Sequence, residues 1–190
     1  MAFTEQLTAA QATLRELAEQ AGTVERIAAL VRDTLLRGGL VLACGNGGSA
    51  TDAQHLAEEL IARYRANRRA LPALALTADS AVLTCIGNDF GFEQVFARQL
   101  EGLARPGDQL VCFSTSGNSP NIVAALRAAR VRGALSVALL GKDGGAARPL
   151  ADVPLVVAHE DTARIQEAHL QIVHYICEVV ERAVLAEGRA

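Results

Sequence analysis

The chain lacks the features that mark several common protein classes. It has 18 Lys and Arg residues against 21 Asp and Glu residues, a formal net charge of −3, which argues against a nucleic-acid-binding protein. Every apolar run is interrupted before it reaches the roughly 20 residues that a membrane-spanning helix needs. Residues 1–5 show no basic segment leading into an apolar one, so we also expect no signal peptide.

Paired cysteines are missing as well. Four cysteines are present, with no C-x-x-C spacing, and all of them stand in apolar surroundings: Cys44, Cys85, Cys112 and Cys177. This pattern predicts buried, reduced thiols in a cytoplasmic protein rather than a disulfide framework. Histidine is also scarce, with 4 residues, so each one is a candidate for a specific role.

The remaining composition predicts a single folded domain. A chain of 190 residues with 51% hydrophobic residues can bury a substantial core, so we expect one domain over residues 1–190. Apolar positions at helical spacing predict a helix near 4–20. A second helix is expected to reach about Leu36, with Thr23 as its cap and Arg37–Gly39 as its end.

Beyond residue 39, short apolar runs alternate with longer helical patterns. Strands are predicted at 40–44, 74–76, 110–113, 135–140 and 153–157. Helices are predicted at 50–63, from Pro120 onward, and from about 162 to 185, where Asp161 or Thr162 provides the cap. Continuous apolar strands alternating with helices favour an α/β fold with a parallel sheet covered by helices on both faces.

A glycine-rich loop follows the first predicted strand and opens a helix. Residues 45–50 match the G-x-G-x-x-A pattern of dinucleotide-binding proteins, but the acidic residue expected about 20 positions later is missing, since Asp79 comes too late. The loop therefore predicts either a phosphate or sugar site built on backbone N–H groups, or a tight turn without a ligand.

A second polar loop, Ser114–Asn121, follows another strand and opens a helix. Ser119 suits the helix cap and Pro120 the first helical position, yet the loop holds more hydroxyls than capping requires. Hydroxyls at the positive end of a helix can bind a phosphate without a cation. Because the loop has no Lys or Arg, a phosphate monoester fits it better than a nucleoside triphosphate.

Ionisable residues recur at helical spacing on two of the predicted helices. His55 and Glu59 are four residues apart and share a face, whereas Glu58 points partly away and is expected to be solvated. On the last helix, Gln166 and His174 lie about 80° apart around the axis. These four side chains could bind zinc, although His55 and Glu59 could equally form a surface ion pair. His169, three residues after Gln166, could be either a neighbour of this group or a packed core residue. His159 is expected in an exposed loop.

Six segments together resemble the phosphoheptose isomerases of the sugar-isomerase (SIS) superfamily, over about residues 4–185. These segments are Cys44–Ser49, Asp52–Leu60, Gly87–Phe92, Ser114–Ser119, Gly141–Gly145 and Arg164–His169. The resemblance implies a three-layer, flavodoxin-like α/β/α sandwich with a five-stranded parallel sheet and added N-terminal helices. It also implies a homotetramer with active sites at subunit contacts, to which residues 1–37 contribute as a helical extension.

The same resemblance implies conversion of D-sedoheptulose 7-phosphate to D-glycero-D-manno-heptose 7-phosphate, on the route to surface polysaccharide. It assigns acid–base chemistry to Glu59 and His174. One zinc ion per subunit is implied, with His55, Glu59, Gln166 and His174 as its ligands. The implied substrate-binding residues are Asn46, Gly47, Gly48, Ser49, Asn88, Asp89, Ser114, Thr115, Ser116, Ser119 and Gln166.

Non-catalytic relatives of this superfamily provide the alternative. One kind binds a replication-initiator partner, and another senses a sugar phosphate while fused to a DNA-binding domain, for which this chain has no room. The relatives of the first kind lack the counterparts of Glu59 and His174. Both residues are present here, which favours the enzyme.

Overall fold

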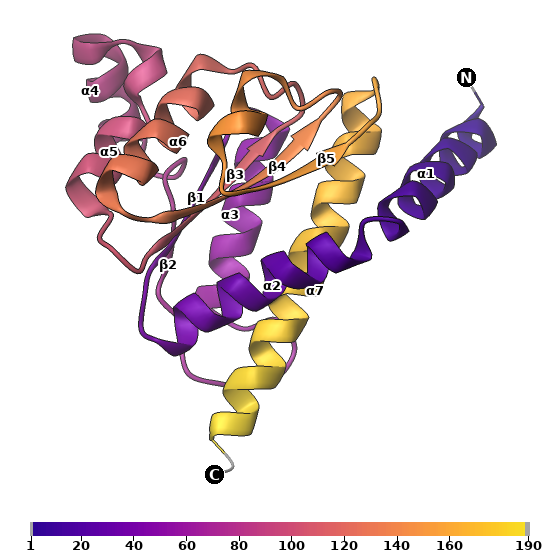
Figure 1. Cartoon of the computed structure of the whole chain (residues 1–190), viewed down its shortest axis with the longest axis horizontal. Coiled ribbons are helices and arrows are strands. Elements are labelled where there is room, and N and C mark those ends of the chain that lie inside the picture. Colours follow the sequence, from indigo (N-terminus) through magenta and orange to yellow (C-terminus); the bar gives the residue numbers. More distant parts are fainter. Residues whose placement is uncertain (1, 189–190) are drawn as a thin grey trace.

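The computed structural model describes residues 2–188 and, within them, a five-stranded parallel sheet in the order β2-β1-β3-β4-β5 (Figure 1). The strands are β1 (Val41–Gly45), β2 (Ala73–Ala75), β3 (Gln109–Ser114), β4 (Leu135–Gly141) and β5 (Val153–Val157). The central strands β1 and β3 are buried along their whole length, as expected for apolar strands covered on both faces. The predicted α/β fold is confirmed.

Two layers of helices cover the sheet. One face carries α2 (Ala21–Leu36), α3 (Gly48–Ile61) and α7 (Thr162–Glu187), with α1 (Phe3–Ala18) projecting beyond them (Figure 1). The other face carries α4 (Ser80–Phe90), α5 (Ala97–Leu103) and α6 (Pro120–Arg132), with the short 3-10 turns η1 (Phe92–Gln94) and η2 (Gly145–Leu150). No helix between residues 2 and 188 is both long and apolar enough to span a membrane.

Alternate residues of each strand point to opposite faces of the sheet and pack against different helix layers. Val111 and Phe113 of β3 join the core beneath α2, α3 and α7, while Leu110 and Cys112 join the core beneath α5 and α6. Both cores therefore meet at β1 and β3, and these two strands hold the loops that follow them on a rigid base.

The start of α2 differs from the prediction. Its N-cap is Gln20, and Thr23 lies inside the helix, because only two residues separate α1 from α2. The Gln20 side chain donates a hydrogen bond to the Val156 carbonyl at 2.9 Å, which fixes this short bend against β5. The cap of α7 is as predicted, since the Asp161 carboxylate accepts from the Ala163 N–H at 2.9 Å.

The cysteines are all free, and three of them are buried. Cys44 and Cys112 face each other in register on β1 and β3, with their Sγ atoms 3.4 Å apart. Cys85 contradicts the expectation of a buried thiol, because it lies on the outward side of α4 and is exposed.

Candidate active site

The two polar loops lie side by side at the point where the strand order of the sheet reverses. The chain moves from β1 outward to β2 and then returns to β3 on the other side of β1. Asn46 after β1 and Asn121 at the start of α6 exchange two side-chain hydrogen bonds, of 2.9 and 2.8 Å. Open α/β sheets bind their ligands in the crevice at such a reversal.

The first loop delivers backbone N–H groups to the start of α3. Gly47 has φ of 58°, a left-handed conformation that favours glycine, and precedes the first helical residue, Gly48. Gly47 and Gly48 are exposed, whereas Ser49 is buried beneath them. Of this group, Asn46, Gly47 and Gly48 are therefore open to a ligand.

The second loop is held by its own hydroxyls. Ser114 Oγ accepts from the Gly117 N–H at 3.1 Å, and Ser116 Oγ accepts from the Asn118 N–H at 3.2 Å. Ser119 occupies the predicted N-cap position of α6, but its side chain makes no capping hydrogen bond. The Ser119 hydroxyl, half-buried with Thr115 at the positive end of α6, thus remains free to meet a phosphate.

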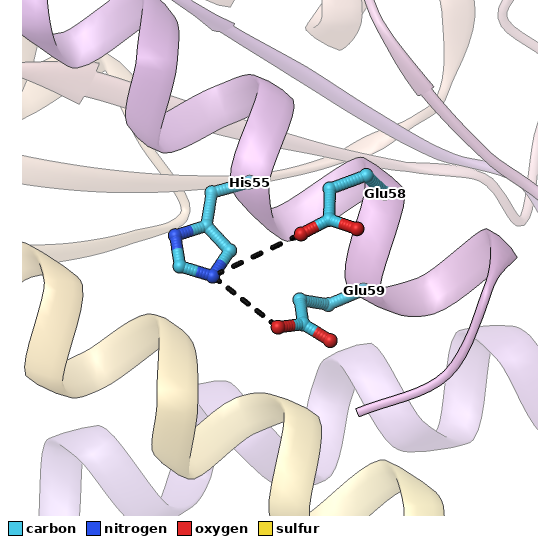
Figure 2. A group of neighbouring side chains, drawn as sticks. All are labelled: His55, Glu58 and Glu59. Carbon is cyan, nitrogen blue, oxygen red and sulfur yellow. Dashed lines mark hydrogen bonds and ion pairs between the residues drawn. The ribbon is translucent and has the colours of Figure 1, made fainter. Parts of the chain in front are cut away.

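Three ionisable side chains cluster on α3, as Figure 2 shows. His55 Nε2 lies 3.3 Å from a Glu59 oxygen and 4.0 Å from a Glu58 oxygen. The exposed side-chain fraction is 32% for His55 and 17% for Glu59 but 61% for Glu58. Glu58 is thus solvated, as expected, and its carboxylate still reaches the cluster.

His174 on α7 joins this cluster from the neighbouring helix. Its ring packs edge-on against His55, with ring centroids 5.2 Å apart. The centroid of the Tyr64 ring lies 6.0 Å from that of the His174 ring. The structure therefore answers a question that residue spacing leaves open: α3 and α7 meet, and His55 contacts both Glu59 and His174.

Gln166 lies at a different level of the same helix pair. A Cβ atom at Gly48 would collide with the Gln166 carboxamide, so this side chain rests against the start of α3. Eight residues of helix separate the Cα atoms of Gln166 and His174 by about 12 Å along the axis. Within one chain, Gln166 therefore lies next to the glycine-rich loop. The other three predicted zinc ligands, His55, Glu59 and His174, lie further along α3 and α7.

The donor atoms of the cluster suit zinc. Imidazole nitrogens and carboxylate oxygens are common zinc ligands, and one ligand atom each from His55, Glu58 and Glu59 lie within 4.8 Å of one another. Asp52, one turn earlier on α3, has a buried Oδ2 without a hydrogen-bond partner. Burial raises the pKa of Asp52 to about 6, although the nearby His55 charge opposes this shift.

The remaining predicted residues have other surroundings. His169 is a core residue, because it is fully buried and its Nε2 lies 3.3 Å from the Leu140 carbonyl oxygen. His159 is half-buried in its loop, where Nδ1 accepts from the Asp161 N–H. Asp79 caps α4, since its carboxylate accepts from two backbone N–H groups. Asp79 therefore gives no support to a dinucleotide site.

Asn88 and Asp89 are exposed at the end of α4. Asn88 Nδ2 donates to Asp89 at 2.7 Å, and Cys85 lies 3.6 Å from Asp89. In the described part of the chain, neither residue is hydrogen-bonded to the two loops. The structure brings together the residues of the two loops and of the ionisable cluster, but not this pair.

The sequence placed Asn121 in the second loop but did not predict its partner: Asn121 is only 2% exposed and pairs with Asn46. Tyr64 was missed from the sequence as a residue of the site. Tyr64 stands in an arginine-rich segment with no periodic signal. Only the approach of α7 reveals that its ring lies beside His174.

Comparisons with known proteins agree with this geometry. The sequence model of the SIS domain matches residues 5–141. A phosphoheptose isomerase of Akkermansia muciniphila is 51% identical over 170 residues, covering 90% of each chain. The phosphoheptose isomerase GmhA of Neisseria gonorrhoeae is similar in structure, with a TM-score of 0.84, 43% identity and 95% of each chain covered. That of Francisella tularensis matches with a TM-score of 0.87 and 34% identity, covering 96% of this chain and 100% of that one.

Proposed function

The chain belongs to the SIS domain family, and from that premise we propose that it is a phosphoheptose isomerase. It converts D-sedoheptulose 7-phosphate to D-glycero-D-manno-heptose 7-phosphate, a precursor of nucleotide-activated heptose for surface polysaccharide such as lipopolysaccharide. The observation that carries this proposal is the packing of α7 on α3, which puts His55 against both Glu59 and His174 on the helix that the glycine-rich loop opens. A phosphorylated substrate and free thiols support a cytoplasmic location.

Aldose–ketose exchange moves a proton between C1 and C2 of the sugar through an enediol. The reaction needs a base at carbon and a proton donor at oxygen. Glu59 is the base in this proposal, because its carboxylate is partly shielded from water and held by His55. His174, packed edge-on against His55, exchanges the proton at oxygen.

The phosphate binds far from the reacting carbons. The hydroxyls of Ser114, Thr115, Ser116 and Ser119 and the N-terminus of α6 surround it in this proposal. The sugar then crosses the reversal point of the sheet toward Asn46, Gly47 and Gly48, with Ser49 buried beneath them. Binding energy gained at the phosphate thereby holds the reacting carbons in place.

One zinc ion per subunit is proposed, with His55, Glu59, Gln166 and His174 as ligands. His55, Glu59 and His174 would hold it where α7 packs on α3, and Gln166, which lies next to Gly48 in the single chain, would have to move to become the fourth ligand. When bound, zinc polarises the substrate carbonyl and stabilises negative charge on its oxygens. His55 keeps Glu59 oriented through the 3.3 Å contact, and Gln166 next to Gly48 also lies where it can bind the sugar.

A homotetramer with active sites at subunit contacts completes the proposal. Asn88 and Asp89 are exposed, and both lie near the large exposed apolar side chains Phe90 and Phe92. This exposure supports a role for the end of α4 in a substrate site that two subunits share. Residues 1–37 are proposed to contribute further subunit contacts, within a single SIS domain that spans the chain.

The test is direct turnover. The purified protein is incubated with sedoheptulose 7-phosphate, with and without a chelator, and the aldose product is followed by NMR. Glu59→Gln keeps the size of the side chain and removes the base, so kcat is expected to fall by at least about 100-fold. Bound zinc and oligomeric state are measured on the same samples.

Near-normal kcat in Glu59→Gln would refute the base assignment. If the wild-type protein binds zinc but produces no aldose, the isomerase proposal fails in favour of a binding protein. Glu16→Gln, a similar change on an exposed side of α1, is the matched control and should retain wild-type turnover.

A further inference from the structure

A buried carboxylate on α7 binds the loop that follows α3. Glu181 lies seven residues after His174 and is 6% exposed. Its two oxygens accept four hydrogen bonds of 3.0–3.1 Å from the backbone N–H groups of Tyr64, Arg65 and Ala66. Three consecutive backbone donors thus point at one side chain of another helix.

Glu181 is charged at neutral pH. Burial alone would raise the pKa of this carboxyl, but the backbone donors and the Arg68 guanidinium outweigh burial and lower the pKa overall. Charged acceptors make the stronger hydrogen bonds, so the contact between α7 and the loop is firm.

The anchored loop carries an aromatic ring to the candidate active site. The Tyr64 ring lies 6.0 Å from the His174 ring at a tilt of 33°, and His174 packs in turn against His55. The Arg65 guanidinium stacks 4.8 Å from the centre of the Tyr64 ring and donates to its hydroxyl at 3.2 Å. His174 is therefore flanked by one ring from α3 and one ring from this loop.

A second contact, made by Arg68, ties the same segment to the end of α3. The Arg68 guanidinium donates to the carbonyls of Glu59 at 2.6 Å and Leu60 at 2.7 Å, which satisfies the open end of α3. Arg68 would hold the end of α3 without any help from Glu181. The Glu181 bonds instead fix residues 64–66, and among these Tyr64 is the one that meets His174.

We propose that Glu181 and Tyr64 are positioning residues: Glu181 fixes the loop, and the Tyr64 ring restricts the His174 imidazole to the orientation that proton transfer needs. The proposal rests on the proposed function, because it assigns His174 a part in the reaction. Neither residue touches the substrate in this scheme, so the main effect of changing them falls on kcat.

The test combines kinetics with a matched control. Tyr64→Ala and Glu181→Gln should each lower kcat by about 10- to 100-fold, the range for misplaced catalytic groups, with KM changed by less than about threefold. Tyr64→Phe keeps the ring and should restore most of the lost kcat. The double variant Tyr64→Ala/Glu181→Gln should lose no more kcat than the more damaging of the two single variants, since both act through one contact.

Asp108→Asn controls for stability alone. Asp108 is also a buried carboxylate that accepts from two backbone N–H groups, those of Leu40 and Arg105, each at 2.8 Å. It lies at the opposite end of the sheet from the two loops. Its replacement should lower Tm and leave kcat at the wild-type value.

Equal losses of Tm in Glu181→Gln and Asp108→Asn, with kcat unchanged in both, would overturn the proposal. So would a wild-type kcat in a folded Tyr64→Ala variant, which decides the matter if Glu181→Gln does not fold. The imidazole resonances of His174 in the protein as purified give a readout that does not need turnover. These resonances should change in Glu181→Gln and Tyr64→Ala but not in Asp108→Asn. Unchanged His174 resonances in Glu181→Gln and Tyr64→Ala would overturn the proposal, even if the wild-type protein proved not to be an isomerase.

Discussion

Individual side chains set the distance between the two halves of the candidate site. The carboxamides of Asn46 and Asn121 are the clearest case, because each donates to the other across the gap between β1 and β3. Asn121 is almost completely buried, so water cannot replace a lost bond cheaply. The pair therefore holds the glycine-rich loop in register with the hydroxyl loop.

Asn121→Asp is predicted to weaken substrate binding. The change removes the hydrogen bond donated to Asn46 and adds a negative charge at the start of α6, where the phosphate is proposed to bind. KM for the sugar phosphate, and Ki for inorganic phosphate, should rise by about tenfold or more. Asn67→Asp makes the same change in an exposed loop and should alter neither constant; unchanged constants in both variants would contradict the prediction.

His169 is predicted to make stability depend on pH. Burial lowers its pKa from 6.5 to about 4, so the unfolded chain takes up a proton that the folded chain refuses. The free energy of unfolding should therefore fall as the pH drops from about 6.5 to about 4, by up to about 3 kcal/mol from this residue. The free energy of unfolding, measured with urea at several pH values, should depend less steeply on pH in His169→Gln than in the wild type. An equal dependence on pH in both proteins would refute the assignment.

At the scale of elements, the loops after the strands pack backbone against backbone. Gly117 has φ of 64°, and a Cβ atom there would collide with the Gly144 carbonyl at the end of the β4 loop. The Ala147 N–H also donates to the Gly117 carbonyl at 2.9 Å. The hydroxyl loop is thus supported from the neighbouring strand and not only by its own helix.

Gly117→Ala should damage both stability and phosphate binding. The left-handed backbone and the collision each disfavour a side chain, and together they are expected to cost about 1–3 kcal/mol. Gly102→Ala, in α5 with no atom near the added methyl group, should keep or raise Tm. Thermal unfolding with and without inorganic phosphate checks this, and an unchanged Tm with an unchanged phosphate shift for Gly117→Ala would contradict it.

The elements themselves were largely predictable. Strands β1 to β5 follow apolar runs, and α7 follows both its periodicity and its Asp161 cap, because these signals are local. The segment between 77 and 108 gave no prediction for α4 and α5, whose short helices bury only part of one side. The site was half predictable: spacing paired His55 with Glu59, and the family resemblance supplied His174. Only the packing of α3 on α7 shows that His174 contacts His55 and adds Tyr64 and Glu181.

At the scale of the whole molecule, α1 projects from the body (Figure 1) and carries an exposed apolar stripe. Phe3, Leu7 and Leu14 are exposed along one side of this helix. Beside them, a hollow of about 330 Å³ lies between α1, α2 and α7 and is lined by Leu17, Val24, Ile172 and Tyr175 among others. Exposed apolar surfaces of this kind mark protein–protein contacts, so the proposed subunit contacts would cover this one.

Leu7→Glu is predicted to break the assembly. A charge in the middle of the stripe cannot be buried without a partner, so the proposed tetramer should shift to smaller species in sedimentation experiments. Ala12→Glu adds the same charge about 160° around the helix from the stripe and should leave the assembly intact. A tetramer that survives Leu7→Glu at micromolar concentration would show that α1 does not hold the subunits together.

The uneven burial of the cysteines has a practical consequence. Three thiols are shielded by the two cores, whereas Cys85 is exposed in the single subunit and stands one helical turn before Asp89. A thiol-reactive fluorophore would therefore attach at one defined position, without any engineering of the chain. Placed next to a residue of the proposed substrate site, such a dye turns the protein into an optical reporter of ligand binding, even for ligands that are never turned over.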